Sequence, residues 1–159
     1  MDEIRTIEGD HEVRDAAFAV VATRFNEFIV EQLIKGALDA LDERGATADD
    51  VTLVRVPGAW ELPLAVRELA ESDDYDAIIA LGAVIRGGTP HFEYVAGECC
   101  RGLADVQQRT GVPVAFGVLT TDTVEQAVER ANTKLGNKGA EVALAAIEMV
   151  NLLSEMERS

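Results

Sequence analysis

The sequence contains very few residues of the kinds that form disulfides and metal sites. Its two cysteines, Cys99 and Cys100, are adjacent, so on a helix they point in different directions and do not readily bridge. Neither a CxxC pair nor a Cys/His spacing typical of a metal site is present. We therefore expect no disulfide framework and no metal site, and we interpret the cysteines as free thiols packed on a helix.

Basic residues and long apolar runs are also scarce. There are 14 lysines and arginines, only three of them lysines, against 29 aspartates and glutamates, and the formal net charge is −15. An acidic surface repels nucleic acid and anionic membranes, so neither is an expected partner. No apolar run reaches the roughly 18 residues of a membrane span, and no apolar segment typical of a secretion signal follows the charged N-terminus. A cytoplasmic location is therefore expected.

What the chain does contain is a regular alternation of apolar runs and helical patterns. With 159 residues, 48% of them hydrophobic, it is long enough for one domain with a full core, and no linker or repeat divides it. The predicted strands are 16–22, 51–56, 75–84 and 114–119, and the predicted helices are 25–44, 60–70, 89–109, 122–131 and a last one after a polar break at 132–139. Strands that alternate with helices predict an α/β fold, a three-layer sandwich whose four-stranded parallel sheet has helices on both faces.

Turn and capping residues predict where several of these elements begin and end. Thr89 suits the N-cap of the third helix and Pro90 its first helical position, while Gly45 provides a stop for the first helix. Asp122 and Glu125 have the spacing of a capping box at the start of the short fourth helix.

The predicted fold also indicates where a site should lie. In parallel α/β folds, ligands bind outside the carboxyl ends of the strands. The segments directly after the four predicted strands are 23–26, 57–61, 86–91 and 120–121. We expect these segments to line any functional site.

The stretch 77–91 carries the strongest functional signal. A buried strand leads through Gly87-Gly88-Thr89 into the start of a helix, an arrangement that offers free backbone N–H groups to a phosphate. The spacing matches neither the P-loop nor the GxGxxG fingerprint. His91 follows in the first helical turn, where the positive helix end favours a neutral imidazole that can accept and return a proton. A plain tight turn and a surface histidine remain the alternative.

Three further residues are candidates for binding a small molecule. Phe25, at the end of the first strand, is either a platform for a flat ligand or an ordinary core aromatic. Glu61 either accepts hydrogen bonds from the hydroxyl groups of a polyol, with Ala59 leaving room for close approach, or favours the dipole of its own helix.

A cationic cluster is predicted in the otherwise acidic chain. Arg130, Lys134 and Lys138 follow one another at intervals of four residues. Such a cluster can hold an anionic substrate that the overall charge repels. Charge matching at a helix C-terminus is the alternative interpretation.

Six motifs, in this order, resemble the 6,7-dimethyl-8-ribityllumazine synthase family across about residues 18–153. They are RFN at 24–26, PGAWELP at 57–63, GAVIRG at 82–87, TPHFEYV at 89–95, PVAFGVLTT at 113–121 and KLGNKG at 134–139. Six motifs in sequence are far more specific than any one of them. Ala83 stands where the family often has threonine, and Asn132 where it often has glycine.

The resemblance implies a flavodoxin-like fold and the penultimate step of riboflavin synthesis. Enzymes of this family are transferases that condense 5-amino-6-(D-ribitylamino)uracil with L-3,4-dihydroxy-2-butanone 4-phosphate. The products are 6,7-dimethyl-8-ribityllumazine, phosphate and water, and the family uses no cofactor or metal.

The resemblance also implies a role for each matching residue. Phe25 should stack on the pyrimidine, His91 should move protons, and Glu61 should accept from the ribityl hydroxyl groups. The other expected contacts are Ala59 and Trp60 with the ribityl chain, Ala83, Val84 and Ile85 with the ring through their backbone, Gly88 and Thr89 with the phosphate together with Arg130, and Phe116 and Lys138 with the substrates. Phe116, Arg130 and Lys138 should come from an adjoining subunit.

Assembly is the last implication of the resemblance. Family members are pentamers or hollow shells of twelve pentamers, and the short 132–139 connection resembles the shell-forming type. Residues 1–15 should form an arm that packs on a neighbouring subunit, within a single domain that spans residues 1–159. A riboflavin synthase is a candidate partner.

Two other functions fit parts of the same pattern. An archaeal-type riboflavin synthase has a similar architecture, and it would make riboflavin from lumazine alone. A non-catalytic shell protein would bind flavin-like ligands tightly without turnover. His91 beside the phosphate turn argues against the second alternative.

The strong negative charge leads to the hypothesis that the protein comes from a host whose cytoplasm has a high salt concentration. The alternative is an ordinary acidic cytosolic protein. Salt screens the repulsion among the many carboxylates. We therefore expect the thermal unfolding midpoint to rise between low and molar KCl, which calorimetry measures. A midpoint that does not rise would contradict the hypothesis.

Overall fold

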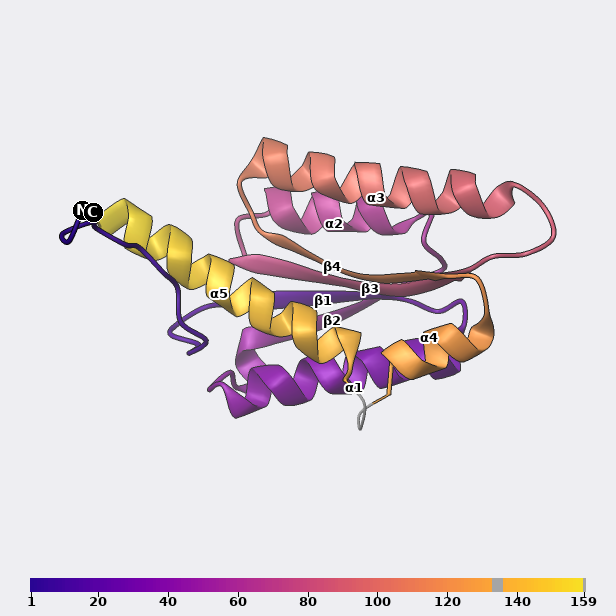
Figure 1. Ribbon diagram of the computed structural model, residues 1–159, viewed down its shortest axis with the longest axis horizontal. Helices are drawn as coiled ribbons and strands as arrows, with labels where there is room; N and C mark the ends of the chain where they lie inside the picture. The colour runs from indigo at the N-terminus through magenta and orange to yellow at the C-terminus, as the bar shows by residue number, and fades with distance from the viewer. Residues whose placement is uncertain (133–135, 159) are drawn as a thin grey trace.

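The computed structural model describes residues 1–132 and 136–158, and its elements alternate as the sequence predicts (Figure 1). The four strands are β1 (Phe18–Thr23), β2 (Val51–Val56), β3 (Ala77–Ile85) and β4 (Val114–Thr121). The helices are α1 (Glu27–Glu43), a short 3₁₀ turn at Ala48–Asp50, α2 (Leu62–Glu71), α3 (His91–Thr110), α4 (Val124–Arg130) and α5 (Lys138–Arg158).

The four strands form one parallel sheet in the order β2-β1-β3-β4, which confirms the predicted fold class. Helices α2 and α3 cover one face, and α1, α4 and α5 cover the other (Figure 1). Every residue of β1 is buried, with Phe18 and Val20 facing α1 and α5 while Ala19 and Val21 face α2 and α3. Burial on both faces explains why this strand is a continuous apolar run rather than an alternating one.

The strand order places a crevice at the carboxyl edge of the sheet. From β1 the chain crosses to α1 on one face, whereas from the neighbouring β3 it crosses to α3 on the opposite face. Loops that leave adjacent strands for opposite faces separate from each other, which makes this the expected ligand position in an open α/β sheet. The segments 24–26 and 86–90 lie at this point.

The predicted N-cap of α3 is displaced by one residue, from Thr89 to Pro90. The helix begins at His91, Pro90 occupies the N-cap position, and no side chain caps the helix. The hydroxyl oxygen of Thr89 lies 3.4 Å from the His91 amide nitrogen, a long contact. The fixed φ of Pro90, −69°, leads into the helix, but proline has no side-chain acceptor. The amide of Glu93 donates to the carbonyl of Pro90 at 3.1 Å, so the first amides of the helix rely on main-chain contacts and on the long Thr89 contact.

The predicted capping box of α4 is displaced by one residue. Thr123, not Asp122, accepts from the amide of Gln126, and the side chain of Gln126 accepts from the Thr123 amide in return. The Asp122 carboxylate instead accepts from Nε of Arg86 at 2.8 Å. A long-range ion pair therefore decides between two overlapping capping patterns. The stop at Gly45 is confirmed by its left-handed φ of 107°.

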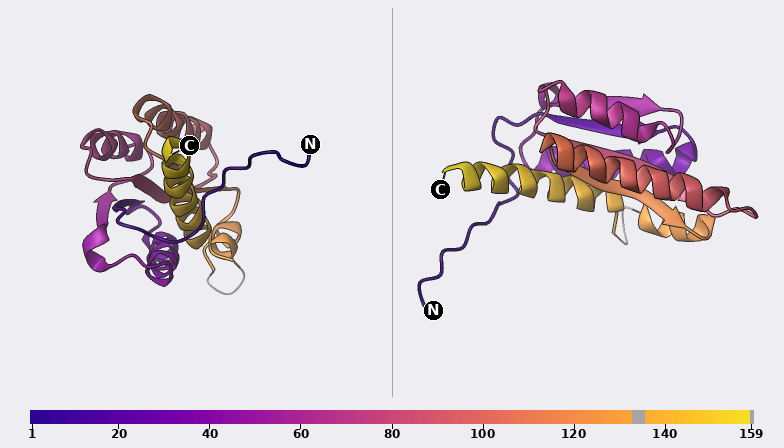
Figure 2. Two further views of the ribbon diagram at one scale, coloured as in Figure 1. Left: turned by 90° about the vertical axis from the view of Figure 1, so that its left-hand side faces the viewer. Right: turned by 90° about the horizontal axis from the view of Figure 1, so that it is seen from above.

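Part of the N-terminal arm packs on the chain's own last helix. The side-chain amide of Asn151 donates to the carbonyls of Asp10 and Glu12, both at 2.9 Å, and Nε2 of His11 lies 2.8 Å from Oε1 of Glu148. Residues 1–8 are exposed and extend away from the domain (Figure 2). That residues 1–15 also pack on a neighbouring subunit stays a prediction.

The two cysteines are free thiols on α3, as predicted. Cys99 is buried against the sheet, and this burial raises the pKa of its thiol to about 12, whereas Cys100 is exposed. No helix among the described residues has the length and apolar content that crossing a membrane requires.

Gly139 in α5 allows a test of how closely α1 and α5 pack, and Gly97 in α3 provides the control. A Cβ at Gly139 would lie 2.0 Å from the carbonyl oxygen of Leu33, whereas a Cβ at Gly97 would meet nothing within 4 Å. We expect Gly139→Ala to lower the free energy of unfolding by about 1–3 kcal/mol, because the helices must separate. The control Gly97→Ala should raise it by about 0.5–1 kcal/mol through helix propensity.

Urea unfolding at one fixed protein concentration measures both changes. Equal effects of the two substitutions would contradict the close approach of α1 and α5.

Candidate functional site

A cavity of about 690 Å³ opens at the carboxyl edge of the sheet, where the fold predicts a site. It is bounded by the loops after β1, β2 and β3 and by the first turn of α3. Its lining contains Phe25, Gly58, Ala59, Trp60, Glu61, Ala83, Val84, Ile85, Gly87, Thr89, His91, Phe92, Tyr94 and Val95. One chain therefore brings nine of the thirteen predicted site residues together.

Two aromatic rings stand exposed at this cavity. Phe25 is 70% exposed and Trp60 is 62% exposed, so the alternative of Phe25 as a core aromatic is wrong. The loop that carries Phe25 is held by main-chain contacts, because its amide donates to the carbonyl of Pro57 at 3.1 Å. An exposed ring on a fixed loop can stack on a planar ligand.

Asn26 joins this loop to β3. It adopts a left-handed conformation with φ 61°, which asparagine tolerates better than most residues, and its side-chain amide donates to the carbonyl of Ala83 at 3.1 Å. This hydrogen bond holds the loop that carries Phe25 at a fixed distance from Ala83 on the other side of the cavity. Sequence reasoning treated Asn26 only as part of a motif and missed this role.

The Glu61 carboxylate is available to a ligand. Glu61 precedes α2, whose first turn contains Pro63, and no described residue donates a hydrogen bond to its side chain. Ala59 is buried, and its small side chain leaves space beside the carboxylate. A free carboxylate here accepts hydrogen bonds from hydroxyl groups, and it also suits the positive end of α2. Both sequence interpretations therefore remain.

The glycine loop is open. Gly87 and Gly88 are outside the left-handed region, and a Cβ at either would meet nothing within 4 Å among the described atoms. Neither backbone conformation nor packing within the chain therefore requires glycine there. Gly88 faces an adjoining hollow of about 500 Å³ rather than the main cavity, and Thr89 lines both. His91 is exposed and lines the main cavity.

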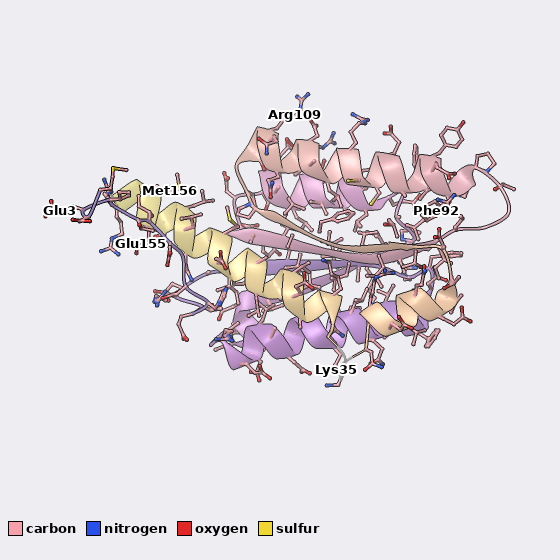
Figure 3. All side chains as sticks on the ribbon, viewed as in Figure 1. Glu3, Lys35, Phe92, Arg109, Glu155 and Met156 are labelled. Atoms are coloured by element: carbon pink, nitrogen blue, oxygen red, sulfur yellow. The ribbon has the colours of Figure 1, made fainter. Side chains whose placement is uncertain are left out.

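Arg86 fixes both ends of this loop. Its guanidinium pairs with Asp122 after β4 and with Glu93 in the first turn of α3, and it lies 4.5 Å from the ring centroid of Phe92. Figure 3 shows Phe92 beneath the first turn of α3, on the side that faces the sheet. These pairs raise the pKa of Arg86 and lower the pKa of Glu93.

The remaining predicted residues lie elsewhere on the chain. Phe116, Arg130 and Lys138 line a separate cavity of about 550 Å³ beside β4, α4 and α5. Phe116 is 38% exposed on the edge strand β4, and Nζ of Lys138 lies 3.1 Å from Oε1 of Glu141. Lys134, the third member of the predicted cationic cluster, lies outside the described residues. One chain alone does not bring these side chains to the first cavity.

Sequence reasoning also missed lining residues on α3. Tyr94 and Val95 lie three and four positions after His91, so all three share one helix face. That spacing was a usable signal. Within residues 1–132 and 136–158, no group of three His, Cys, Asp or Glu side chains is arranged to hold a metal ion.

The ion pairs of Arg86 lead to a pH prediction. Because Arg86 lowers the pKa of Glu93 in the folded chain, the stabilisation is present above the unfolded pKa of about 4.3 and is lost as the pH falls through the folded pKa. In Arg86→Gln we expect the pKa of Glu93 to rise toward about 4.3. Carboxyl-carbon NMR between pH 2 and 6 follows it, and an unchanged midpoint would contradict the pairing.

The geometry agrees with the comparison of the chain with known protein families. The sequence model of the 6,7-dimethyl-8-ribityllumazine synthase family matches residues 15–154 of the 159-residue chain. The match includes all four strands, all five α-helices except the end of α5, and every lining residue of both cavities. The chain therefore belongs to the 6,7-dimethyl-8-ribityllumazine synthase family, whose enzymes act in riboflavin biosynthesis.

Proposed function

We propose that this chain condenses 5-amino-6-(D-ribitylamino)uracil with L-3,4-dihydroxy-2-butanone 4-phosphate to give 6,7-dimethyl-8-ribityllumazine, phosphate and water. The observation that carries the proposal is the main cavity, where an exposed ring, a free carboxylate, an open glycine loop and an imidazole meet. These groups match the flat pyrimidine, the polyol chain and the phosphate of the two substrates. Membership of the family supports the same reaction.

Phe25 stacks on the pyrimidine in the proposed complex. The exposed ring offers its face, and the backbone of Ala83, Val84 and Ile85 meets the polar edge of the heterocycle. The carbonyl of Ala83 already accepts from Asn26. Specific recognition of the ring therefore depends on those main-chain groups of the segment 83–85 that the pairing with β4 and the Asn26 contact leave unused.

The ribityl chain lies along the loop after β2. Its hydroxyl groups donate to the carboxylate of Glu61, and the small side chain of Ala59 lets the chain approach the backbone. Charge-assisted hydrogen bonds of this kind are stronger than those between neutral groups. Trp60 covers the polyol from the solvent side.

The phosphate binds at the start of α3. Gly88 and Thr89 offer main-chain amides and a hydroxyl group, and the helix N-terminus favours a negative charge. Arg130 completes the site from an adjoining subunit, which also supplies Phe116 and Lys138. The separation of the two cavities within one chain supports a site that two copies share.

A homopentamer is the proposed assembly, because a ring lets each chain give one cavity and receive the other. The short connection between α4 and α5 favours a shell of twelve pentamers, with a riboflavin synthase as a candidate partner.

His91 moves protons between the reacting groups. The amine of the pyrimidine attacks the ketone, and loss of one water gives an imine. Elimination of phosphate follows, and the ring closes when the nitrogen that carries the ribityl chain attacks the remaining carbonyl with loss of a second water. A neutral imidazole accepts a proton in one step and returns it in another. Fixed positions of the two substrates supply much of the rate, since they replace a bimolecular encounter.

The two alternative functions predict different products. An archaeal-type riboflavin synthase would convert lumazine alone into riboflavin, and a non-catalytic flavin-binding shell would bind lumazine without turnover. Incubation with lumazine alone and with the two substrates together separates all three.

The test mixes the two substrates and follows lumazine fluorescence. We expect turnover in the native protein and a kcat about 10²–10⁴-fold lower in His91→Ala, with unchanged assembly by light scattering. His11→Ala is the matched control, because His11 is the other histidine of the chain and pairs with Glu148 far from the cavity. No turnover in the native protein would refute the proposed function, and an undiminished rate in His91→Ala would reassign the proton transfer.

A further inference from the structure

The second cavity depends on two side chains from different helices. Arg130 is the last residue of α4 and Lys138 is the first residue of α5, and both line the cavity with Phe116. Both are long, flexible side chains whose useful position depends on where their backbones are held. A group that fixes the end of α4 to the start of α5 would therefore determine the geometry of the cavity.

The side chain of Asn137 makes this connection. Its Nδ2 donates to the carbonyl of Ala131, directly after Arg130, and to the carbonyl of Gln32 in α1, both at 2.9 Å. Its Oδ1 accepts from the amide of Ala140 in the first turn of α5 at 3.0 Å. One side chain thus joins three elements and caps α5.

Two glycines leave the space that the Asn137 side-chain amide occupies. A Cβ at Gly36 in α1 would lie 2.1 Å from Oδ1 of Asn137, and a Cβ at Gly139 would lie 2.0 Å from the carbonyl oxygen of Leu33. The two glycines let α1 and α5 approach closely enough for Asn137 to reach Gln32.

The arrangement requires more than a helix cap. An N-cap needs only a side-chain acceptor, which serine or aspartate supplies. Asn137 also uses two N–H donors toward main-chain carbonyls, and only a short primary amide combines both donors with the acceptor.

We propose that Asn137 is a positioning residue that sets the backbone of Arg130 and Lys138 for binding the phosphate of the four-carbon substrate. This inference rests on the proposed function for the identity of the anion, and on the hydrogen bonds above for the placement of the two cations. Asn137 acts through its neighbours and does not touch the substrate.

The test substitutes Asn137→Ser, which keeps a capping acceptor and the net charge but is too short to reach Ala131 and Gln32. Because a displacement of about 1 Å can cost about 10²-fold, we expect the KM for the phosphorylated substrate to rise about tenfold or more. The KM for the pyrimidine and kcat at saturation should stay within about twofold. A variant that only loses stability would not give this split.

Three further variants make the result specific. Asn151→Ser is the matched control, because Asn151 also donates to two main-chain carbonyls, but it lies within α5 and far from the cavity. Arg130→Ala provides the reference for complete loss of the cation. Gly36→Ala adds a Cβ that displaces the Asn137 amide while it favours the helical conformation of α1, so it should weaken phosphate binding even if Asn137→Ser does not fold.

Calorimetric titration with inorganic phosphate separates this inference from the proposed function, since it needs no turnover. We expect Asn137→Ser and Gly36→Ala to weaken phosphate binding about tenfold or more, as misplacement of a binding group does, while Asn151→Ser binds as the native protein does. Unchanged phosphate affinity in Asn137→Ser and Gly36→Ala would overturn the positioning role. A native protein that binds phosphate but has no turnover would refute the proposed function. The phosphate affinities of the variants would then still decide whether Asn137 is a positioning residue.

Discussion

The pairing of β1 with β3 in the middle of the sheet controls the position of everything at the carboxyl edge. Their register places Ala22 beside Leu81, and the chain then leaves the two strands toward opposite faces. All of β1 and the first seven residues of β3 are buried, so the two strands are packed on both faces of the sheet. The loops that carry Phe25 and the glycines therefore start from a rigid base, which is what a binding site on loops requires.

Apolar burial alone does not place the site residues, because the hydrophobic effect has no direction. Directional contacts provide the rest. Asn26 joins the first loop to the carbonyl of Ala83, and Arg86 joins the glycine loop to the segment after β4. Asn137 has the same function at the second cavity. At each cavity a polar side chain that lies outside the predicted set of site residues fixes the backbone of those within it.

The sequence was sufficient for the order and type of the elements, because each strand is a compact apolar run and each long helix has a clear apolar face. It also located three of the segments that line the main cavity, since parallel strands must end at one edge, whereas the fourth, 120–121, lies within β4 and Thr120 lines the second cavity. The start of α4 was misplaced because two capping patterns overlapped and the ion pair of Arg86 with Asp122 decided between them. The start of α3 was misplaced because Pro90, rather than Thr89, occupies its N-cap position. The bridge from Asn137 to Gln32 joins residues 105 positions apart, so no local pattern contains it. Specific residue roles came from the family resemblance rather than from periodicity.

The presence of two separate cavities on one chain has a genetic consequence under the proposed assembly. A chain with a damaged first cavity still offers an intact second cavity to its neighbour, and the reverse also holds. When two differently damaged alleles are expressed in one cell, some of the mixed rings contain a complete reaction centre. Defects in this gene would then complement one another within the locus, a pattern that an enzyme with its whole site on one chain does not produce.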